Sequence, residues 1–232
     1  SWSSGTNLNS TRAFNNAAGS IPSAITFGGS PAPTQAYAEQ WNGSAWTEVA
    51  EYNTSRGQGG ASGFVSTDAL FFGGEGPNKA NTEIWNGTSW TEVNDMNSGR
   101  YSTAAFGTTT ATIAGGGSPP DTATETESWN GTNWTEVNNM NAGRQGLVGV
   151  GLTGNTAALA VGGETSPGTD QASTEEWNGT SWTELNDLST GRDYFGGSGT
   201  TTSALAFGGN PGYKSDTEEW SYSHAIKTVT TS

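Results

Sequence analysis

The chain has 232 residues with no cysteine, 35 glycines and 10 tryptophans, and 22 acidic residues against 8 lysines and arginines give a formal net charge of −14. Such a length suits one large domain or two small ones. The missing cysteines exclude disulfides, thiolate metal sites and cysteine nucleophiles. The negative charge argues against nucleic-acid partners and anionic membrane surfaces, because lysine and arginine carry both kinds of binding.

Hydrophobic residues make up 31% of the chain and charged residues only 13%, and the tryptophans are too numerous for a disordered protein. We therefore expect a folded chain that stacks these rings. No apolar run reaches the roughly 18 residues of a spanning helix, so we predict no membrane insertion. The sequence starts at Ser1 without an initiator methionine, and we expect a processed or trimmed start.

A repeat of 44 to 48 residues runs through the sequence. The motif Trp-Asn-Gly-x-x-Trp occurs four times, and an arginine follows ten residues after its second tryptophan. The same spacing links Trp2 to Arg12, so five copies fill residues 1–232 as a single domain. The phase of the repeat is set by Trp2, Trp46, Trp90, Trp134 and Trp182.

Each copy reads as four short strands. In the third copy, residues 101–106 and 111–115 are predicted strands joined by a turn. Residues 124–129 and 134–137 follow as a hairpin around Asn130-Gly131, a dipeptide that tolerates the positive φ angles of tight turns. A glycine pair ends the second strand of every copy: Gly28-Gly29, Gly73-Gly74, Gly115-Gly116, Gly162-Gly163 and Gly208-Gly209.

Four-stranded repeats of this length cannot bury their own faces, which is typical of a β-propeller. Because no segment shows a helical period, we predict an all-β fold. We expect a single five-bladed β-propeller of four-stranded antiparallel blades. Its inner strands carry small residues, which suits the close approach of strands around a narrow axis. The double glycine, the aromatic pair and the arginine after Trp-Thr-Glu-Val-x-x-Met, as in residues 90–100, resemble the kelch repeat over nearly the whole chain. Kelch propellers more often have six or seven blades, so the count of five rests on this sequence.

Closure of the ring has to involve the chain termini, since an incomplete last blade would expose an unpaired strand edge. Residues 1–4 match an outermost strand of the repeat, and residues 226–230 alternate between apolar and polar. We predict that both ends join the last blade. Which terminus supplies the closing strand stays open.

The repeated tryptophans are predicted to form core between blades, in preference to an exposed ladder for sugar rings. A glutamate stands two residues before the first tryptophan of each pair, and strand alternation carries it inward on the same face. A buried carboxylate needs a cation, and the repeat arginine is available in every copy. We predict five structural ion pairs within a blade or between neighbouring blades; an anion-binding ring of arginines is the alternative. The residues are Arg12, Arg56, Arg100, Arg144 and Arg192 with Glu39, Glu83, Glu127, Glu175 and Glu218.

Two further repeated features have structural interpretations. The Asn-Gly-Ser/Thr triplets, formally glycosylation acceptors, are explained by the hairpin turn. The Asn/Asp clusters before each arginine lack the carboxylate density of a calcium site, so we interpret them as turn residues.

The sequence does not predict an enzyme. His224, the sole histidine, lies in the C-terminal tail, which excludes a histidine triad and a multi-histidine metal site. The inner strands lack the paired carboxylates of glycosidases, and Asp193 is the only carboxylate close to one of them. We therefore predict no catalytic residues, no cofactor and no metal.

Variation among the copies points to binding. In a four-stranded blade, the loops between the second and third strands share one face with the connections between blades, and these loops differ from copy to copy. Variable loops on a rigid scaffold usually carry recognition. The ligand-binding candidates on them are Gln35, Asn78, Asp121, Asp170 and Tyr213.

The repeated sequence pattern Thr-Glu-Glu-Trp-Asn-Gly-Thr-Ser-Trp-Thr-Glu resembles kelch-like propeller repeats in predicted structural or tail proteins of marine phages. This resemblance implies a non-enzymatic virion-associated or adhesion module, extracellular or on a particle. Its partner would be a host-surface glycan or another structural protein subunit. A free carbohydrate-binding lectin is the alternative, and an intracellular protein-binding kelch scaffold is a third reading.

Overall fold

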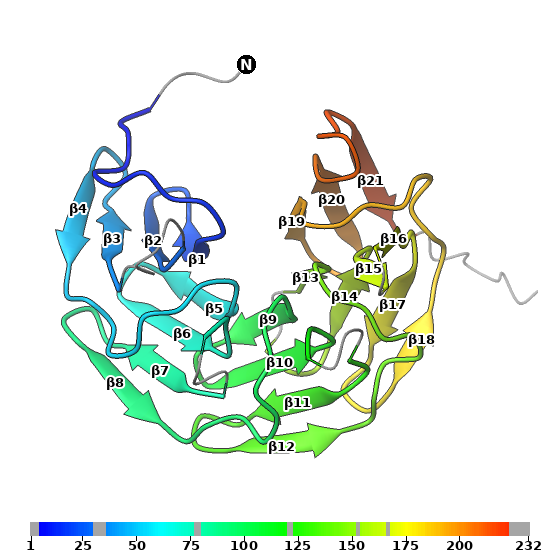
Figure 1. Ribbon diagram of the computed structural model, residues 1–232, viewed down its shortest axis with the longest axis horizontal. Helices are drawn as coiled ribbons and strands as arrows, with labels where there is room; N and C mark the ends of the chain where they lie inside the picture. Colours follow the sequence, from blue (N-terminus) through cyan, green and yellow to red (C-terminus); the bar gives the residue numbers. More distant parts are fainter. Residues whose placement is uncertain are drawn as a thin grey trace, which may run out of the picture.

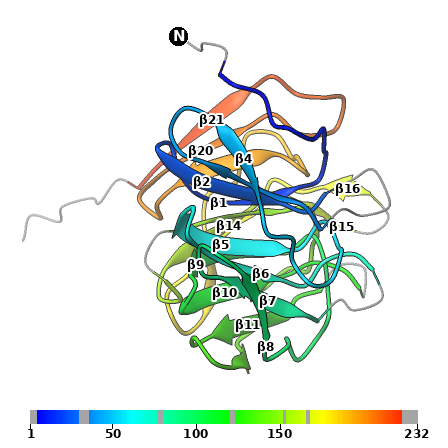
Figure 2. The same cartoon turned by 90° about the vertical axis from the view of Figure 1, so that its left-hand side faces the viewer.

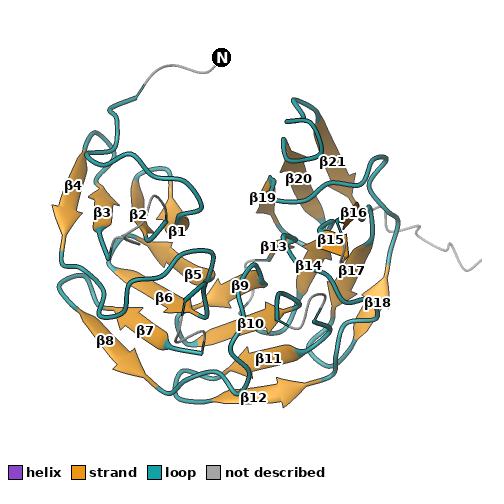
Figure 3. Ribbon diagram, viewed as in Figure 1, coloured by secondary structure: helices purple, strands orange, loops and turns teal. Residues whose placement is uncertain are grey.

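The computed structural model describes residues 5–29, 36–76, 80–119, 123–151, 154–165 and 168–222. They form an all-β protein with five antiparallel sheets arranged as the blades of a β-propeller (Figure 1), and Figure 3 shows strands joined by loops. The predicted fold class is thus confirmed. In the described part of the chain, no helix is long and apolar enough to cross a membrane.

Strands follow one another through each sheet in chain order, from the propeller axis outward. The first sheet contains β1 (Asn16–Ser20), β2 (Ser23–Phe27), β3 (Ala38–Trp41) and β4 (Trp46–Val49). The second contains β5 (Gly60–Val65), β6 (Asp68–Phe72), β7 (Thr82–Trp85) and β8 (Trp90–Val93). The third contains β9 (Ala104–Thr108), β10 (Ala111–Gly115), β11 (Thr126–Trp129) and β12 (Trp134–Val137).

The fourth sheet contains β13 (Val148–Val150), β14 (Ala158–Val161), β17 (Thr174–Trp177) and β18 (Trp182–Glu184). A two-stranded hairpin, β15 (Glu164–Thr165) and β16 (Thr169–Asp170), lies in the loop between β14 and β17, toward one end of the axis (right in Figure 2). The fifth sheet contains β19 (Gly196–Gly199), β20 (Ser203–Phe207) and β21 (Thr217–Ser221). The candidates for its fourth strand, residues 1–4 and 226–230, lie outside the described residues.

The sheets contact their neighbours through their innermost strands, in the order β1, β5, β9, β13 and β19. Figure 1 shows the first and fifth sheets at the two ends of the arc. The small residues predicted for the inner strands allow this close approach. A Cβ added at Gly149 would lie 2.7 Å from the carbonyl oxygen of Ala105 on the neighbouring sheet, and one at Gly197 would lie 2.5 Å from Cγ1 of Val148.

Two details of the third repeat differ from the sequence prediction. Strand β9 starts at Ala104, because the preceding Tyr101 bridges to Ser118 and Ser102 has a left-handed backbone. The left-handed glycine pair is Gly116-Gly117, with φ of 67° and 107°, one residue later than predicted. Three successive glycines hid this register, and the first of them, Gly115, ends β10 against the Trp182 ring.

The tryptophans form core between sheets, as predicted. The first tryptophan of the middle three pairs is at most 1% exposed. The second reaches the preceding sheet: the centroids of Trp90 and Phe27 are 5.0 Å apart, and those of Trp134 and Phe72 are 4.7 Å apart. At the end of the arc Trp46 is only half-buried. Packing between sheets therefore buries these rings.

Candidate functional site

The repeat arginines and glutamates lie together in five ion pairs, each within one sheet and its preceding connection. The N–O distances are 2.5 Å for Arg12–Glu39, 2.6 Å for Arg56–Glu83, 3.1 Å for Arg100–Glu127, 2.6 Å for Arg144–Glu175 and 2.7 Å for Arg192–Glu218. In the four complete sheets the glutamate is at most 2% exposed at its side chain, whereas Glu218 of the three-stranded sheet is 21% exposed. The pairs hold each blade to the connection that enters it.

In four of the five pairs, an asparagine three residues before the arginine completes the carboxylate environment. The backbone N–H and the side-chain Nδ2 of Asn53 both donate to Oε2 of Glu83, each at 2.7 Å. Oε1 accepts from the N–H of Thr54 at 3.3 Å and from Arg56 at 2.6 Å. Every lone pair of the buried carboxylate is thus engaged, as burial demands. The same position holds Asn9, Asn97 and Asn141, and Ser189 in the fifth copy.

Sequence reasoning interpreted these asparagines only as turn residues. Their constant position three residues before each repeat arginine was the available signal, but the partner glutamate lies about 30 residues away in the chain. The arginines belong to the same framework: Arg56 also donates Nε to the carbonyl of Gly73 at 2.8 Å. None of the five arginines lines the axial hollow described below.

Hydrogen bonds and the paired arginines lower the pKa of two of these glutamates. Burial pushes the pKa of Glu39 upward, but the N–H groups of Asn9 and Ser10 and the guanidinium of Arg12 stabilise the carboxylate, so its pKa lies below the usual range. In Glu218, burial is likewise outweighed by hydrogen bonds from Ser189 and by the charge of Arg192, and the pKa is lowered.

The propeller axis opens at one end into a ring of five residues with left-handed backbone. They occupy the position two residues after each repeat arginine, and four of the five are not glycine. Non-glycine residues adopt this conformation rarely, so its repetition is a built feature. The residues and φ angles are Phe14 (55°), Gln58 (55°), Ser102 (54°), Gly146 (63°) and Tyr194 (44°).

Backbone hydrogen bonds between neighbouring blades hold this ring, which we call the axial ring. The N–H of Ser102 donates to the carbonyl of Gln58 at 2.7 Å, and the N–H of Gly146 donates to Ser102 at 3.1 Å. The N–H of Tyr194 donates to Gly146 at 2.8 Å, and that of Gln58 donates to Phe14 at 3.4 Å. The left-handed backbone is therefore fixed by the ring, and the side chains are free to vary.

The axial ring surrounds an open hollow. Phe14 is 57% exposed and Tyr194 is 39% exposed, and their rings lie edge to face with centroids 6.4 Å apart. The hydroxyl of Ser102 donates to Oε1 of Gln58 at 3.1 Å and lies 3.5 Å from the Tyr194 hydroxyl. Gly146 leaves room for the Tyr194 ring, because a Cβ there would lie 3.1 Å from it. The hollow combines aromatic surface with amide and hydroxyl groups.

The residue before Tyr194 is the buried Asp193, which lies near two further acidic side chains. Burial, and then the negative charges of Glu164 and Asp170, raise the pKa of Asp193, which is 5% exposed. Its Oδ1 has no hydrogen-bond partner. Burial also raises the pKa of the adjacent Tyr194, and the charges of Glu164 and Asp193 add to the effect. Tyr194 therefore keeps its hydroxyl proton at neutral pH. Among the described residues, no three acidic or histidine side chains are grouped to hold a metal ion.

The predicted binding face is the one that carries the axial ring. Bridges such as Gly57–Glu75 and Tyr101–Ser118 join the connections between blades to the loops that follow the second strands. Among the predicted ligand-binding residues, Gln35, Asn78 and Asp121 lie outside the described residues.

The two described candidates do not line the hollow: Asp170 lies on β16 and is half-buried, and Tyr213 is 92% exposed. Sequence reasoning missed the axial ring. Its signal was a single position after each arginine where five otherwise similar copies carry five different residues.

No protein-family model matches the sequence, and no curated protein matches it significantly.

Proposed function

We propose that this protein is a non-enzymatic recognition module that binds a surface carbohydrate through the axial hollow. One observation carries the proposal: five equivalent positions share an unusual backbone, yet their side chains are Phe, Gln, Ser, Gly and Tyr. A structural requirement alone would select one residue type, preferably glycine, at every copy. Selection of different side chains on a fixed backbone fits recognition of an asymmetric ligand.

The chemistry of the hollow favours a sugar. Pyranose rings have an apolar face that packs on aromatic rings and hydroxyls that exchange hydrogen bonds with amides and hydroxyls. Phe14 and Tyr194 supply the aromatic surface, and Gln58 and Ser102 supply the polar groups. Tyr194 adds a protonated hydroxyl. These groups bind by contact and hydrogen bonding and need no proton transfer.

The resemblance of the repeat to kelch-like propellers of predicted phage tail proteins supports the wider role. On this proposal, the module is exposed on a virion or another adhesive particle and attaches it to a glycan of the host surface. Binding to another structural subunit of the particle is the competing role, and it makes no use of the hollow.

A glycan array tests the proposal with three matched proteins. The unmodified protein is expected to bind a defined set of glycans, and Tyr194→Ala is expected to weaken that binding about tenfold through loss of aromatic contact. Tyr213→Ala is the control, because Tyr213 is an exposed tyrosine outside the hollow. If the array stays silent, or if both variants bind as the parent does, carbohydrate recognition at the axial hollow is wrong.

A further inference from the structure

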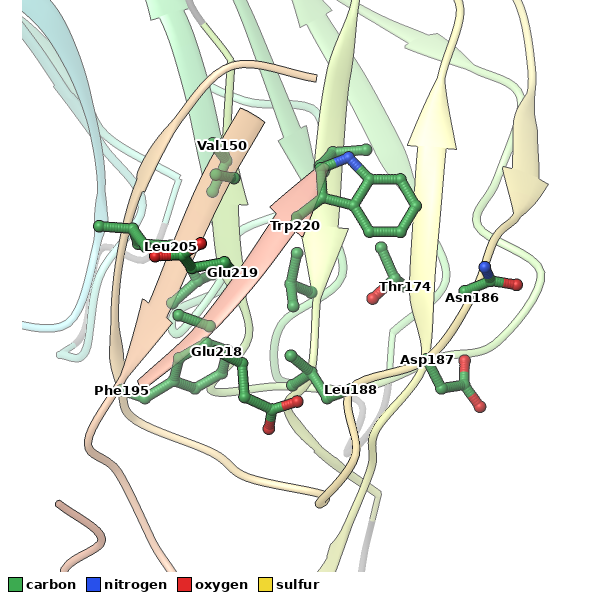
Figure 4. Close-up of a pocket in the computed structure, with 15 residues that line it drawn as sticks. Val150, Thr174, Asn186, Asp187, Leu188, Phe195, Leu205, Glu218, Glu219 and Trp220 are labelled. Atoms are coloured by element: carbon green, nitrogen blue, oxygen red, sulfur yellow. The ribbon is translucent and has the colours of Figure 1, made fainter. Parts of the chain in front are cut away.

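A second hollow lies between the fourth and fifth sheets (Figure 4). Its lining is mostly apolar and includes Val161, Leu188 and Trp220. Its polar lining residues are Thr174, Asn186, Asp187, Glu218 and Glu219. It lies away from the axial hollow, with which it shares only Phe195. We call it the indole socket, because a tryptophan side chain fills the equivalent space between other blades.

Between the second and third sheets, and between the third and fourth, the corresponding space is filled by the second tryptophan of the later sheet. Trp134 packs on Phe72, and its indole N–H donates to Oγ1 of Thr82 at 2.9 Å. Trp182 donates in the same way to Oγ1 of Thr126 at 3.0 Å.

Thr174 occupies the same place in the fourth sheet. It lies opposite Val161 as Thr82 lies opposite Phe72. Leu188 takes the position of Met96, since the N–H of each donates to a carbonyl two residues before the threonine. The indole socket therefore has the walls and the acceptor that a tryptophan side chain uses two blades earlier.

The N-terminal segment follows the route of a connection that leaves an outermost strand. The hydroxyl of Thr6 donates to the carbonyl of Ser44 at 2.6 Å, as the side chain of Asn94 does to Thr132 at 3.0 Å. Both donors lie four residues after a second-position tryptophan, Trp2 and Trp90.

The next contact repeats as well. Asn9 donates from its backbone and its side chain to Glu39, as Asn97 does to Glu127. Residues 6–9 thus lie on the first sheet as residues 94–97 lie on the third. In the other repeats, the residues before this position form the outermost strand of the preceding blade.

We propose that residues 1–4 pair with β21 of the same chain as the missing fourth strand of the fifth sheet, and that Trp2 fills the indole socket and donates its indole N–H to Thr174. The competing segment is the C-terminal tail. In the other hairpins the two tryptophans are five residues apart, as in Trp177 and Trp182, and this spacing puts Ala225 at the socket. Alanine has neither the volume nor the N–H donor that the socket accommodates.

This pairing would join the first sheet to the fifth and close the ring. It would also keep Phe14 beside Tyr194, an aromatic contact between the two ends of the arc. The inference does not depend on what the axial hollow binds.

Disulfide trapping tests the pairing, because the chain has no cysteine of its own. In the complete hairpins, the residue before the first tryptophan lies opposite the residue after the second, as Ile84 lies opposite Thr91. The proposed register therefore places Ser3 opposite Glu219, within reach of a disulfide. Under mild oxidation, Ser3→Cys with Glu219→Cys is expected to form this bond in the monomer, identified by peptide mapping.

The matched control is Ser3→Cys with Glu176→Cys. Glu176 has the equivalent place in the fourth sheet, but it already lies opposite Thr183 of β18, so no disulfide is expected. A third variant, Ile226→Cys with Glu219→Cys, reports on the tail and is expected to stay reduced.

Three outcomes would overturn the proposal. They are a tail disulfide in place of the Ser3 disulfide, equal trapping of Ser3 at Glu219 and Glu176, and a Ser3–Glu219 disulfide found only between two chains. The last result would identify a second copy as the occupant. As an independent readout, Trp2→Ala is expected to lower the melting temperature more than Trp2→Phe, which still fills most of the socket.

Discussion

Buried charge is the dominant feature at the level of single residues. Each of the first four repeats places a carboxylate inside a blade and surrounds it with an asparagine, a backbone N–H and an arginine. The five arginines are not held equally. Arg56 donates to Gly73, Thr54 and Glu83 at 2.6 to 2.9 Å. In Arg100, Nε has no hydrogen-bond partner and Nη1 lies 3.1 Å from Oε1 of Glu127 without the alignment of a hydrogen bond, and burial lowers the pKa of the guanidinium despite the nearby Glu127.

This difference predicts unequal costs of removal. Arg56→Ala leaves the Glu83 carboxylate buried without its cation and is expected to lower the free energy of unfolding by about 3 to 5 kcal/mol. Arg100→Ala is expected to lower it by less, because its guanidinium makes fewer hydrogen bonds. Urea denaturation of the two variants measures both values. Equal losses, or a negligible loss at Arg56, would contradict this account.

Removing the charge of Asp193 is expected to stabilise the protein, whereas removing the arginines destabilises it. The pKa of Asp193 is raised in the folded protein, so the native state favours the protonated acid, and stability falls as pH rises from the ordinary value of 3.8 through the folded pKa. Asp193→Asn keeps the shape without the charge and is expected to raise the melting temperature at pH 7. The gain should shrink below pH 3.8, where both residues are neutral.

The same change at Asp95, which is exposed, serves as the control. A stabilisation by Asp193→Asn that is the same at acidic and neutral pH would show that the charge of Asp193 is not its cause.

At the level of strands, the inner layer is held by close backbone approach. Gly149 of β13 has no room for a side chain: an added Cβ would lie 2.7 Å from the carbonyl oxygen and 2.8 Å from the amide nitrogen of Ala105. Backbone cannot move aside as a flexible side chain can. Gly149→Ala is therefore expected to separate β13 from β9 and to lower stability by about 1 to 3 kcal/mol.

The control for this prediction is Gly5→Ala, since Gly5 has no atom within 4 Å of an added Cβ. Thermal melts of the two variants suffice. Should both melt at the temperature of the parent protein, the inner strands are less tightly packed than the structure indicates.

The repeated positions explain how much of this architecture the sequence could predict. Trp85, Glu83 and Arg56 each recur in the repeat. A tryptophan at such a position is expected in the core, and a glutamate on the same strand face is expected to be buried. A buried glutamate in turn is expected to pair with the repeated arginine. The role of Asn53 was not predictable in that way, because an asparagine in a turn is already satisfied locally and its bond to Glu83 depends on tertiary folding. The axial ring was missed for the opposite reason: its residues differ, and a search for agreement among copies passes over them.

At the level of the whole molecule, the stability of the two blades at the ends of the arc is expected to depend on pH. The two glutamates with lowered pKa, Glu39 and Glu218, lie in the first and fifth sheets, the blades at the ends of the arc (Figure 1). A lowered pKa means that the native state holds the charged carboxylate. Its contribution to stability is complete above the ordinary value of 4.5 and is lost as pH falls through the folded pKa.

Acid should therefore destabilise these end blades even though it reduces the net charge of −14, which relieves repulsion across the molecule. Glu39→Gln is expected to melt below the parent protein at pH 7 and to approach it as pH falls below 4.5, because protonation removes the same charge from the parent. Glu48→Gln is the matched control, since Glu48 lies directly opposite Glu39 on β4 but is exposed. Melting temperatures measured from pH 7 to about pH 3 separate the two effects. A constant offset of Glu39→Gln over that range would mean that the carboxylate contributes through its shape alone and that the ion pair does not stabilise the end of the arc.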